Sequence, residues 1–278
     1  MMTLVLIELQ KIFRKWRTYI GFIALFGMTL IVQLALYFTQ ESFVQSTTRS
    51  LSDQFTLQGN FFNGYVVAYL ILNAMFVHIP FLIVLVGGDL FAGEATAGTY
   101  RMLLTRPVSR LSLVTSKYLA GFAYTFLFIL FLLAISLGGS LIFFGSGELI
   151  VFKEKIIIYA PSDVMWRMAS AYAYAALSMM TVMAFSIFFS SLVSNAIGPI
   201  VTTMAVIIVF LILSAIPVDF LQNLRPYFFT SHLIQWDGFF ADPVDYKELA
   251  NSALVLVGHI VFLYALTAFL FIRKDILS

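Results

Sequence analysis

The chain has 278 residues, of which 61% are hydrophobic and 11% are charged, and its mean hydropathy is +0.97. Soluble domains carry about 25% charged residues, so this composition excludes an ordinary soluble protein and predicts an all-α membrane protein with the bilayer as its solvent. The sequence has no cysteine, which excludes a disulfide framework and a thiolate metal site.

The first 18 residues predict an amphipathic helix in the membrane interface. Apolar side chains recur there at spacings of three and four: Val5, Leu9, Ile12, Phe13 and Trp16. Charged side chains are expected on its other faces: Glu8, Lys11, Arg14 and Lys15. The length of the apolar stripe favours this helix over a generic basic flank of the first span. The segment is unlike a cleavable signal, because its apolar run is long, lacks a small-residue cleavage site and precedes further spans.

Six apolar stretches are long enough to cross a membrane, for which a helix needs roughly 20 residues. They cover about residues 19–38, 66–87, 118–144, 168–192, 197–216 and 252–272. The fourth and fifth almost touch, and one helix across both would be far too long for a single crossing. Asn195 suits a helix cap and Pro199 suits the first turn of a new helix. We therefore expect a tight hairpin between these two spans.

Lysine and arginine divide the connecting segments into a basic side and an acidic side. The basic side comprises the N-terminus, residues 88–117, residues 193–196 and the C-terminal tail, with ten basic and four acidic residues. The other three loops carry six basic and ten acidic residues. Because connecting segments rich in Lys and Arg stay in the cytoplasm, the sequence predicts a multi-pass protein of the cell membrane with both termini in the cytoplasm.

The three loops of the acidic side are each too short for a large separate domain: residues 39–65, 145–167 and 217–251. The aromatic stretch R-P-Y-F-F-T-S-H-L-I-Q-W in the last loop is expected to dip into the outer interface, where Trp and Tyr prefer to lie. Asp242 and Pro243 suit the cap and first position of a helix that continues into the sixth span. A simple surface loop is the alternative.

Common motifs of catalysis and nucleotide binding are missing from the sequence. It contains no G-x-x-x-x-G-K-[ST], H-E-x-x-H or G-x-S-x-G, so we expect no catalytic residue, metal site or ATP site in this chain. His78, His232 and His259 lie in different segments, and His78 and His259 lie inside spans. A histidine in a span can be functional, but bonding to a neighbouring helix is the favoured interpretation, as it is for Gln33 and Asn73.

The segment between the second and third spans holds more distinctive residues than a basic loop requires. E-A-T-A-G-T-Y-R-M-L-L is expected to form a short helix with Glu94 near its N-terminal end, a position that the helix dipole favours. Gly93 and Gly98 would let another backbone approach closely. Pro107 would end the helix, because the residue before a proline avoids the helical region.

Two arginines complete this segment, Arg106 and Arg110, and both are placed for phosphate headgroups or an acidic partner. The alternative is a solvated basic loop. It would explain the arginines but not the glycines, Glu94 or the leucine pair.

The stretch G-E-A-T-A-G-T-Y-R-M-L-L-T-R-P-V-S-R, followed by S-K-Y-L-A-G-F, resembles a signature of ABC transporter permeases of the ABC type 2 class, also called type V exporters. That signature is G-E-x-x-x-G-T-x-x-x-L-L-x-x-P-V-S-R. The resemblance extends over the whole chain, with the interfacial helix, the six spans, the inner hairpin and the long outer loop. The chain is more similar to stand-alone bacterial permeases than to fused ones, because no nucleotide-binding domain is attached.

The resemblance implies a cytoplasmic coupling helix that docks on a separate ABC ATPase subunit. ATP and Mg would bind to that subunit, and this chain would hold no cofactor. By position, the coupling element would comprise Gly93, Glu94, Gly98, Thr99, Leu103, Leu104 and Pro107, flanked by Arg106 and Arg110. Two permease chains, identical or related, would pair in the bacterial inner membrane. The expected partners are therefore the ATPase, a second permease and the lipid bilayer, with no nucleic acid, and the substrate is not indicated.

Two other functions stay open. A secondary transporter or channel that works alone is disfavoured, because the spans show no series of buried ionisable residues for an ion relay and no obvious repeats. A membrane enzyme is disfavoured by the lack of a catalytic cluster.

Overall fold

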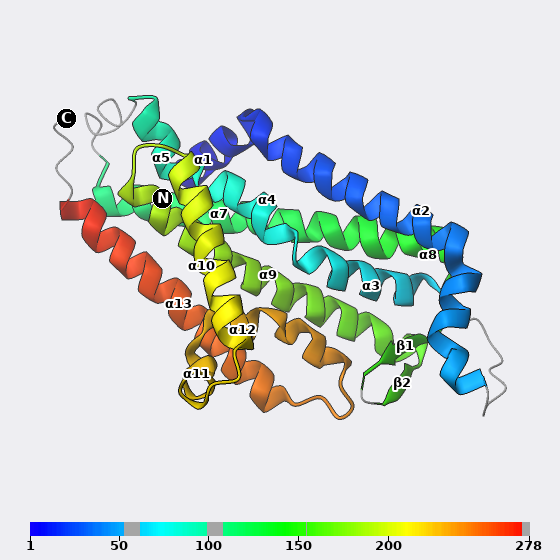
Figure 1. Cartoon of the computed structure of the whole chain (residues 1–278). Coiled ribbons are helices and arrows are strands. Elements are labelled where there is room, and N and C mark those ends of the chain that lie inside the picture. The colour runs from blue at the N-terminus through cyan, green and yellow to red at the C-terminus, as the bar shows by residue number, and fades with distance from the viewer. Residues whose placement is uncertain (53–61, 99–107, 154, 274–278) are drawn as a thin grey trace.

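The computed structural model describes residues 1–52, 62–98, 108–153 and 155–273, with only the backbone for residues 43–52 and 152 (Figure 1). In this part of the chain, six helical segments are long and apolar enough to span a membrane: Trp16–Ser42, Ile79–Thr96, Arg110–Phe144, Pro161–Leu192, Ile197–Ala215 and Tyr246–Arg273. Each overlaps one predicted span. The chain therefore has the helices of a multi-pass membrane protein.

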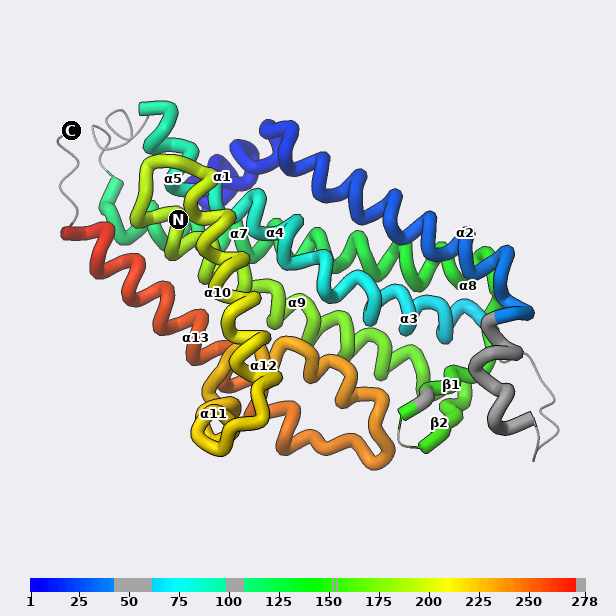
Figure 2. Tube along the Cα trace, viewed as in Figure 1, coloured from blue at the N-terminus to red at the C-terminus, as the bar shows by residue number. Residues whose placement is uncertain are grey.

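Helix α9 (Pro161–Leu192) runs through the middle of the bundle (Figures 1 and 2). Its neighbours include α7 (Arg110–Leu133), α4 (Ile79–Gly87), α10 (Ile197–Ala215) and α13 (Tyr246–Arg273). Several buried residues of α9 are small, among them Ala171, Ala175 and Ala176. Small side chains let membrane helices approach closely, which explains the central place of α9.

The second predicted span is interrupted, so the expectation of one continuous helix over residues 66–87 is wrong. Its parts are α3 (Gly64–Phe76), α4 and α5 (Asp89–Thr96). The break falls at Val77 and His78, two residues before Pro80, and the amide of His78 donates to the carbonyl of Met75, three residues back. Proline lacks an N–H and disturbs the preceding turn. Beyond the break, α4 leads through Gly88 into α5, so this helical segment extends past the predicted end of the span.

The third span is irregular near its far end, where it packs beside α2 (Trp16–Ser52). It consists of α7, one π-helical turn η1 (Ala134–Gly138) and α8 (Gly139–Phe144). The amide of Gln33 on α2 lies 3.0 Å from the carbonyl of Ile135 and 3.1 Å from the hydroxyl of Ser140. A π-helical turn disturbs the regular helical hydrogen bonds, and Gln33 joins the two helices there, as the sequence predicts.

The hairpin between the fourth and fifth spans is confirmed. Helix α9 ends at Leu192 and α10 begins at Ile197. The side chain of Asn195 accepts a hydrogen bond of 3.0 Å from the amide of Ile197, and Pro199 lies in the first turn of α10. The local signals of cap and proline therefore located this turn correctly.

The opposite end of the bundle adds one short β-hairpin, which the sequence did not predict, to an otherwise helical fold. Strand β1 (Leu149–Phe152) pairs antiparallel with β2 (Ile156–Tyr159), and Leu149 lies opposite Tyr159. Ile157 and Tyr159 are buried whereas Ile156 and Ile158 are exposed, the alternation of a strand with one covered face. Short helices follow α10: α11 (Asp219–Leu224), η2 (Arg225–Tyr227), α12 (Phe229–Leu233) and η3 (Ile234–Phe240).

The last helix, α13, begins later than the sequence predicts. It starts at Tyr246, and the carboxylate of Asp245 accepts a hydrogen bond of 2.9 Å from the amide of Glu248. Asp245 is thus the cap, and Asp242 with Pro243 lies in the preceding connection. The predicted continuation of this helix into the sixth span is confirmed.

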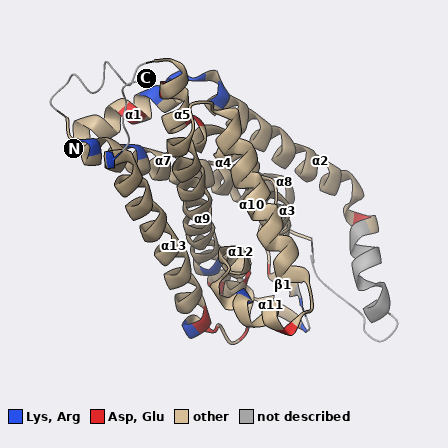
Figure 3. Cartoon of the chain, turned by 60° about the vertical axis from the view of Figure 1, so that its left-hand side comes forward, with Lys and Arg blue, Asp and Glu red and all other residues tan. Residues whose placement is uncertain are grey.

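Charged residues gather at the two ends of the bundle, and the long stretches of helix between them are largely uncharged (Figure 3). One end holds α1 (Met2–Arg14), α5, the start of α7 and the end of α13 (Figure 1). We call it the basic end, after the charge count of its segments. The other end holds the β-hairpin and α11.

Candidate functional site

The candidate site is the basic end of the bundle, because the segment with the permease-like signature begins there. Helix α5 ends at Thr96, and the chain turns at Gly98 with a φ of +65°. Glu94 therefore lies in the last turn of α5, and the expectation that it opens a helix is wrong. Four members of the predicted coupling element lie outside the described residues, Thr99, Leu103, Leu104 and Pro107, as does the flanking Arg106.

Glu94 belongs to a closed ring of four alternating charges, which we call the ion-pair ring: Glu8, Lys11, Glu94 and Lys117. The ammonium of Lys11 lies 2.6 Å from Glu8 Oε1 and 2.7 Å from Glu94 Oε1. The ammonium of Lys117 lies 2.9 Å from Glu8 Oε2 and 2.7 Å from Glu94 Oε2. Each carboxylate thus binds both ammonium groups, and the ring links α1, α5 and α7.

Lys117 is the most deeply buried member of the ring, with 1% of its side chain exposed. Its ammonium also donates a hydrogen bond of 2.8 Å to the carbonyl of Leu90 and lies 5.2 Å from the centre of the Phe91 ring. A buried charge is tolerated only when it is paired and hydrogen-bonded. The ring and the Leu90 carbonyl meet that condition for Lys117.

The ring also sets the protonation of the two α1 side chains. Burial alone would raise the pKa of Glu8, but the charges of Lys117 and Lys11 and their hydrogen bonds outweigh burial and lower this pKa below 4.5. Burial alone would lower the pKa of Lys11, but the hydrogen bonds and charges of Glu8 and Glu94 outweigh it and raise this pKa above 10.5. Both residues are therefore charged at neutral pH.

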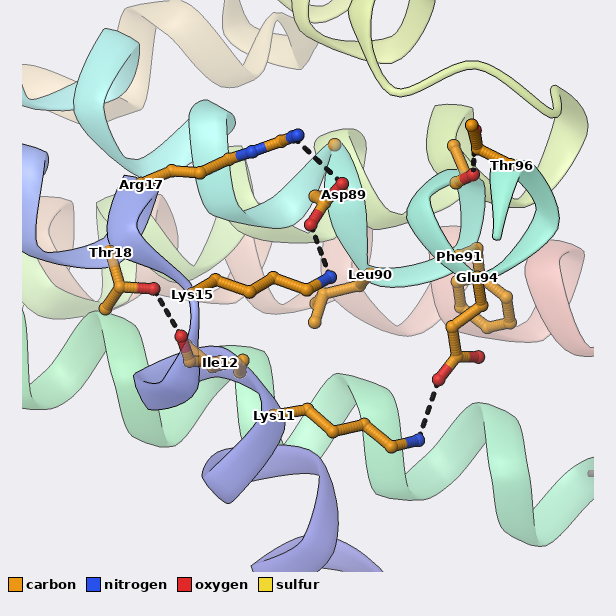
Figure 4. A network of polar contacts seen from close by, with 12 residues as sticks. Lys11, Ile12, Lys15, Arg17, Thr18, Asp89, Leu90, Phe91, Glu94 and Thr96 are labelled. Atoms are coloured by element: carbon orange, nitrogen blue, oxygen red, sulfur yellow. Dashed lines mark hydrogen bonds and ion pairs between the residues drawn. The ribbon is translucent and has the colours of Figure 1, made fainter. Parts of the chain in front are cut away.

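Asp89 forms a second ionic contact beside the ring (Figure 4). Its carboxylate lies 2.5 Å from the ammonium of Lys15 and 2.9 Å from Nη1 of Arg17. A Cβ at Gly93 would clash with Oδ1 of Asp89. Gly93 therefore leaves room for this carboxylate inside the chain.

Serine and threonine hydroxyls fasten α5 to α9 and to the hairpin after it. Ser190 accepts hydrogen bonds of 3.0 Å from the amides of Phe91 and Ala92 and lies 2.7 Å from the carbonyl of Gly88. The hydroxyl of Thr96 donates a hydrogen bond of 2.5 Å to the carbonyl of Ser194. The first turn of α5 thus receives the capping that a helix start needs, and its last turn is tied to the hairpin.

Arg110 contacts the end of another helix. Its Nη1 donates a hydrogen bond of 2.8 Å to the carbonyl of Ile272, in the last turn of α13. Cations stabilise the C-terminal ends of helices, where carbonyl groups lack intrahelical partners. Arg110 therefore links α7 to α13.

Between α1, the α4–α5 junction and the start of α7 lies a cavity of about 550 Å³. Its walls are largely apolar and include Leu4, Ile7, Ile12, Val86, Leu90 and Leu113. Charged members of both ionic groups reach the same cavity: Glu8, Lys11, Lys15, Arg17, Asp89 and Glu94. The cavity therefore combines apolar walls with charged groups.

The three histidines bond within the chain. Nδ1 of His78 lies 3.0 Å from the carbonyl of Ala74, and Nδ1 of His259 lies 2.8 Å from that of Val255, four residues back in each case. His232 joins the Ser252 hydroxyl, at 2.9 Å, to the Pro226 carbonyl, at 2.8 Å. These hydrogen bonds of His78 and His259 are thus local, and not to a neighbouring helix as expected. In the part of the chain that the structure describes, no three His, Asp or Glu side chains form a candidate metal site.

Sequence reasoning missed the ion-pair ring, although two signals pointed to it. Glu8 is spaced three residues from Val5 and four from Ile12, so it shares their face, and the assignment of Glu8 to another face is wrong. The hydroxyl of Ser109 accepts a hydrogen bond of 3.1 Å from the amide of Ser112 and caps α7. A helix that starts there carries Lys117 two turns into the bundle, so this buried ammonium lies just before the predicted third span.

Helix α1 ends at Arg14, before the predicted end at residue 18, and Trp16 and Arg17 belong to the next helix. The backbone of Lys15 is extended between α1 and α2, and the hydroxyl of Thr18 lies 2.5 Å from the carbonyl of Ile12. This contact holds the elbow between α1 and α2.

Residues 25–277 match a family described as "Protein of unknown function (DUF2705)". A comparison with curated proteins found no match. Because the matched region covers most of the 278 residues, the chain belongs to the DUF2705 family.

Proposed function

We propose that this chain is the membrane-spanning permease subunit of an ATP-driven ABC transporter, an exporter that works with a separate cytoplasmic ATPase. The observation that carries the proposal is the permease-like signature from Gly93 to Arg110. ATP and Mg would bind to the ATPase, and the chain itself would catalyse no reaction.

The anchoring of α5 supports a mechanical role for this signature. Glu94 contacts Lys11 of α1 and Lys117 of α7, and Ser190 and Thr96 tie α5 to α9 and its hairpin. A push on the segment after Gly98 would therefore reach several helices together. In this proposal Gly93 and Glu94 act inside the permease, and the residues from Thr99 to Pro107 meet the ATPase.

A second permease chain belongs to the proposal because two polar side chains are exposed on the α3–α4 segment. Asn73 and His78 are both exposed near the middle of the predicted second span. Polar groups are expensive in hydrocarbon and usually face other helices or a water-filled cavity. A second chain, identical or related, would cover these two side chains.

Membrane orientation follows from the same proposal. The basic end would lie in the cytoplasm of a bacterial cell, with both termini on that side and α1 in the inner interface. Exposed apolar side chains of α1, including Met2, Leu6 and Ile7, would contact lipid.

Co-purification with the ATPase tests the proposal. The full chain would be expressed with the ABC ATPase that the proposal requires and purified through a tag on the permease. Leu103→Glu with Leu104→Glu places two charges in the segment that we assign to the ATPase contact. We expect at least tenfold less ATPase to be recovered with this variant, because a buried, unpaired charge disrupts an interface.

Leu224→Glu is the matched control, because Leu224 is exposed on α11 at the opposite end of the bundle. It should retain the ATPase fully. Equal recovery from the wild type and the Leu103/Leu104 variant, at equal membrane insertion, would contradict the proposal.

A secondary transporter is the second candidate, and the buried ion-pair ring is the observation that favours it, because ionisable groups inside membrane proteins often form relays. The ring is closed and neutral, with two acidic and two basic groups. Proton uptake by proteoliposomes that contain the chain alone, driven by a solute gradient and abolished by Glu94→Gln, would favour this candidate over the permease.

A further inference from the structure

We propose that the cavity beside α1 binds one anionic phospholipid, with the phosphate at Lys15 and Arg17 and an acyl chain against the apolar walls. The site does not depend on the proposed transport function. It would hold a lipid even if no ATPase bound to the chain.

The size and walls of the cavity fit an acyl chain. Its volume of about 550 Å³ falls within the range of roughly 300–1,000 Å³ that is typical of small-molecule sites. Leu4 and Ile7 come from α1, Val86 and Leu90 from the α4–α5 junction, and Leu113 from α7. The cavity lies at the end of a bundle of membrane-spanning helices, where lipid is the nearest apolar ligand.

The charges of the cavity are sorted by depth. The side chains of Lys11, Lys15 and Arg17 are 36%, 45% and 49% exposed, whereas those of Glu8, Glu94 and Asp89 are 5%, 10% and 7% exposed. A ligand that enters from outside therefore meets cations, with the carboxylates behind them. This order favours an anionic headgroup over a zwitterionic one.

The surplus positive charge lies at one place. The ion-pair ring balances two carboxylates against two ammonium groups, but Asp89 alone faces both Lys15 and Arg17 (Figure 4). A guanidinium carries five N–H donors, and the contact with Asp89 engages Nη1. The elbow between α1 and α2 is thus the preferred position for the lipid phosphate.

Native mass spectrometry tests the site. The full chain would be extracted from vesicles of equal parts dioleoyl phosphatidylglycerol and dioleoyl phosphatidylcholine, and the lipids that stay bound would be counted. We expect one retained phosphatidylglycerol per chain. Arg17→Gln should lower the preference for phosphatidylglycerol about fivefold, the factor that corresponds to one interfacial cation.

Two further variants separate lipid binding from misfolding and from general charge. Lys15→Gln with Arg17→Gln and Asp89→Asn removes the whole group without leaving Asp89 unpaired, and it should abolish the preference. Arg14→Gln makes the same net change of one charge at an exposed residue that does not line the cavity, and it should keep the preference within about twofold.

Ala97→Phe would fill the cavity from its rim and should reduce retention of the phosphatidylglycerol. A preference that survives the triple variant, or an equal loss in Arg14→Gln, would overturn the site. Displacement of the bound lipid by glycerol 3-phosphate alone would also overturn it, because the headgroup would then bind without a chain.

Discussion

Lys117 holds three oxygen atoms of two other elements while it is almost fully buried. Its contacts are the carboxylates of Glu8 and Glu94 and the carbonyl of Leu90. Lys117→Met would leave two buried carboxylates to share Lys11. Removing one partner of a buried ion pair costs about 3–5 kcal/mol, so we expect a loss of this size, measured as a lower unfolding temperature in detergent.

A compensating change tests whether the unpaired carboxylates cause this loss of stability. Lys117→Met with Glu94→Gln removes one charge of each sign and leaves the Glu8–Lys11 pair, so it should recover most of the lost stability. Lys153→Met, at an ion pair with Asp237 that is a quarter to a third exposed, should cost less than about 1 kcal/mol. Equal losses in all three variants would show that the ring does not hold this end together.

The pH dependence of stability follows from the shifted pKa values of Glu8 and Lys11. The pKa of Glu8 is lowered in the folded state, so its stabilisation is complete above 4.5 and is lost as the pH falls through the folded value. The pKa of Lys11 is raised, so its stabilisation is complete below 10.5 and is lost as the pH rises through the folded value. We expect a flat contribution between these limits.

Unfolding temperatures across this pH range measure the effect. Glu8→Gln should reduce the acid-side loss relative to the wild type, because the substituted side chain cannot take up the proton. A steep change near pH 7 in the wild type that Glu8→Gln removes would contradict the assignment.

At the scale of elements, α5 depends on one hydroxyl of α9. Ser190 is the acceptor for the amides of Phe91 and Ala92. Ser190→Ala would leave two buried donors without this partner, and an unsatisfied buried group costs about 1–3 kcal/mol. We expect faster hydrogen exchange of residues 89–96, measured by mass spectrometry.

Thr125→Ala is the control, because Thr125 is also buried but its hydroxyl donates to the carbonyl of Gly121 in its own helix. It should leave the exchange of residues 89–96 unchanged. Unchanged exchange in Ser190→Ala as well would show that α5 is held by the ion pairs alone.

The sequence predicted elements well where a local signal decides them. Asn195 and Pro199 located the hairpin, and runs of apolar residues located the helices. Prediction from the sequence failed for elements that depend on contacts between residues far apart in the chain. The residues around Lys155 do not distinguish a β-hairpin from a loop. Strand β1 is stabilised by burial against the bundle, and the local sequence does not indicate that contact.

The candidate site shows the same division. The predicted spans and the charge count assigned Glu94 and Lys117 to the same connecting segment, at one end of the bundle. The other two members of the ring, Glu8 and Lys11, lie on another helix, 86 and 83 residues before Glu94, and a single sequence does not report such contacts. The apolar stripe of α1 did indicate which face packs inward, and Glu8 lies on that face.

At the scale of the whole molecule, the separation of charge between the two ends predicts orientation. The natural sequence has no cysteine, so single cysteines report on one position each. Ser109→Cys, at the basic end, should react with a membrane-impermeant maleimide only after the cells are opened. Ser146→Cys, before the β-hairpin, should react in intact cells, since the acidic end is expected outside.

Both positions must be compared at equal expression, with a denatured sample as the measure of full labelling. Reaction of Ser109→Cys in intact cells would reverse the orientation and remove the ATPase contact from the cytoplasm.

Cross-linking of Leu103→Cys to the ATPase tests the proposed function at the contact itself, because it shows whether the permease-like segment touches a separate ATPase. The protein would be co-expressed with that ATPase, and adducts from a short bifunctional thiol-to-amine reagent would be resolved by mass. We expect an ATPase adduct from Leu103→Cys and none from Leu224→Cys at the opposite end. A fully inserted Leu103→Cys protein that gives no adduct, with the ATPase present in the same membranes, would contradict it.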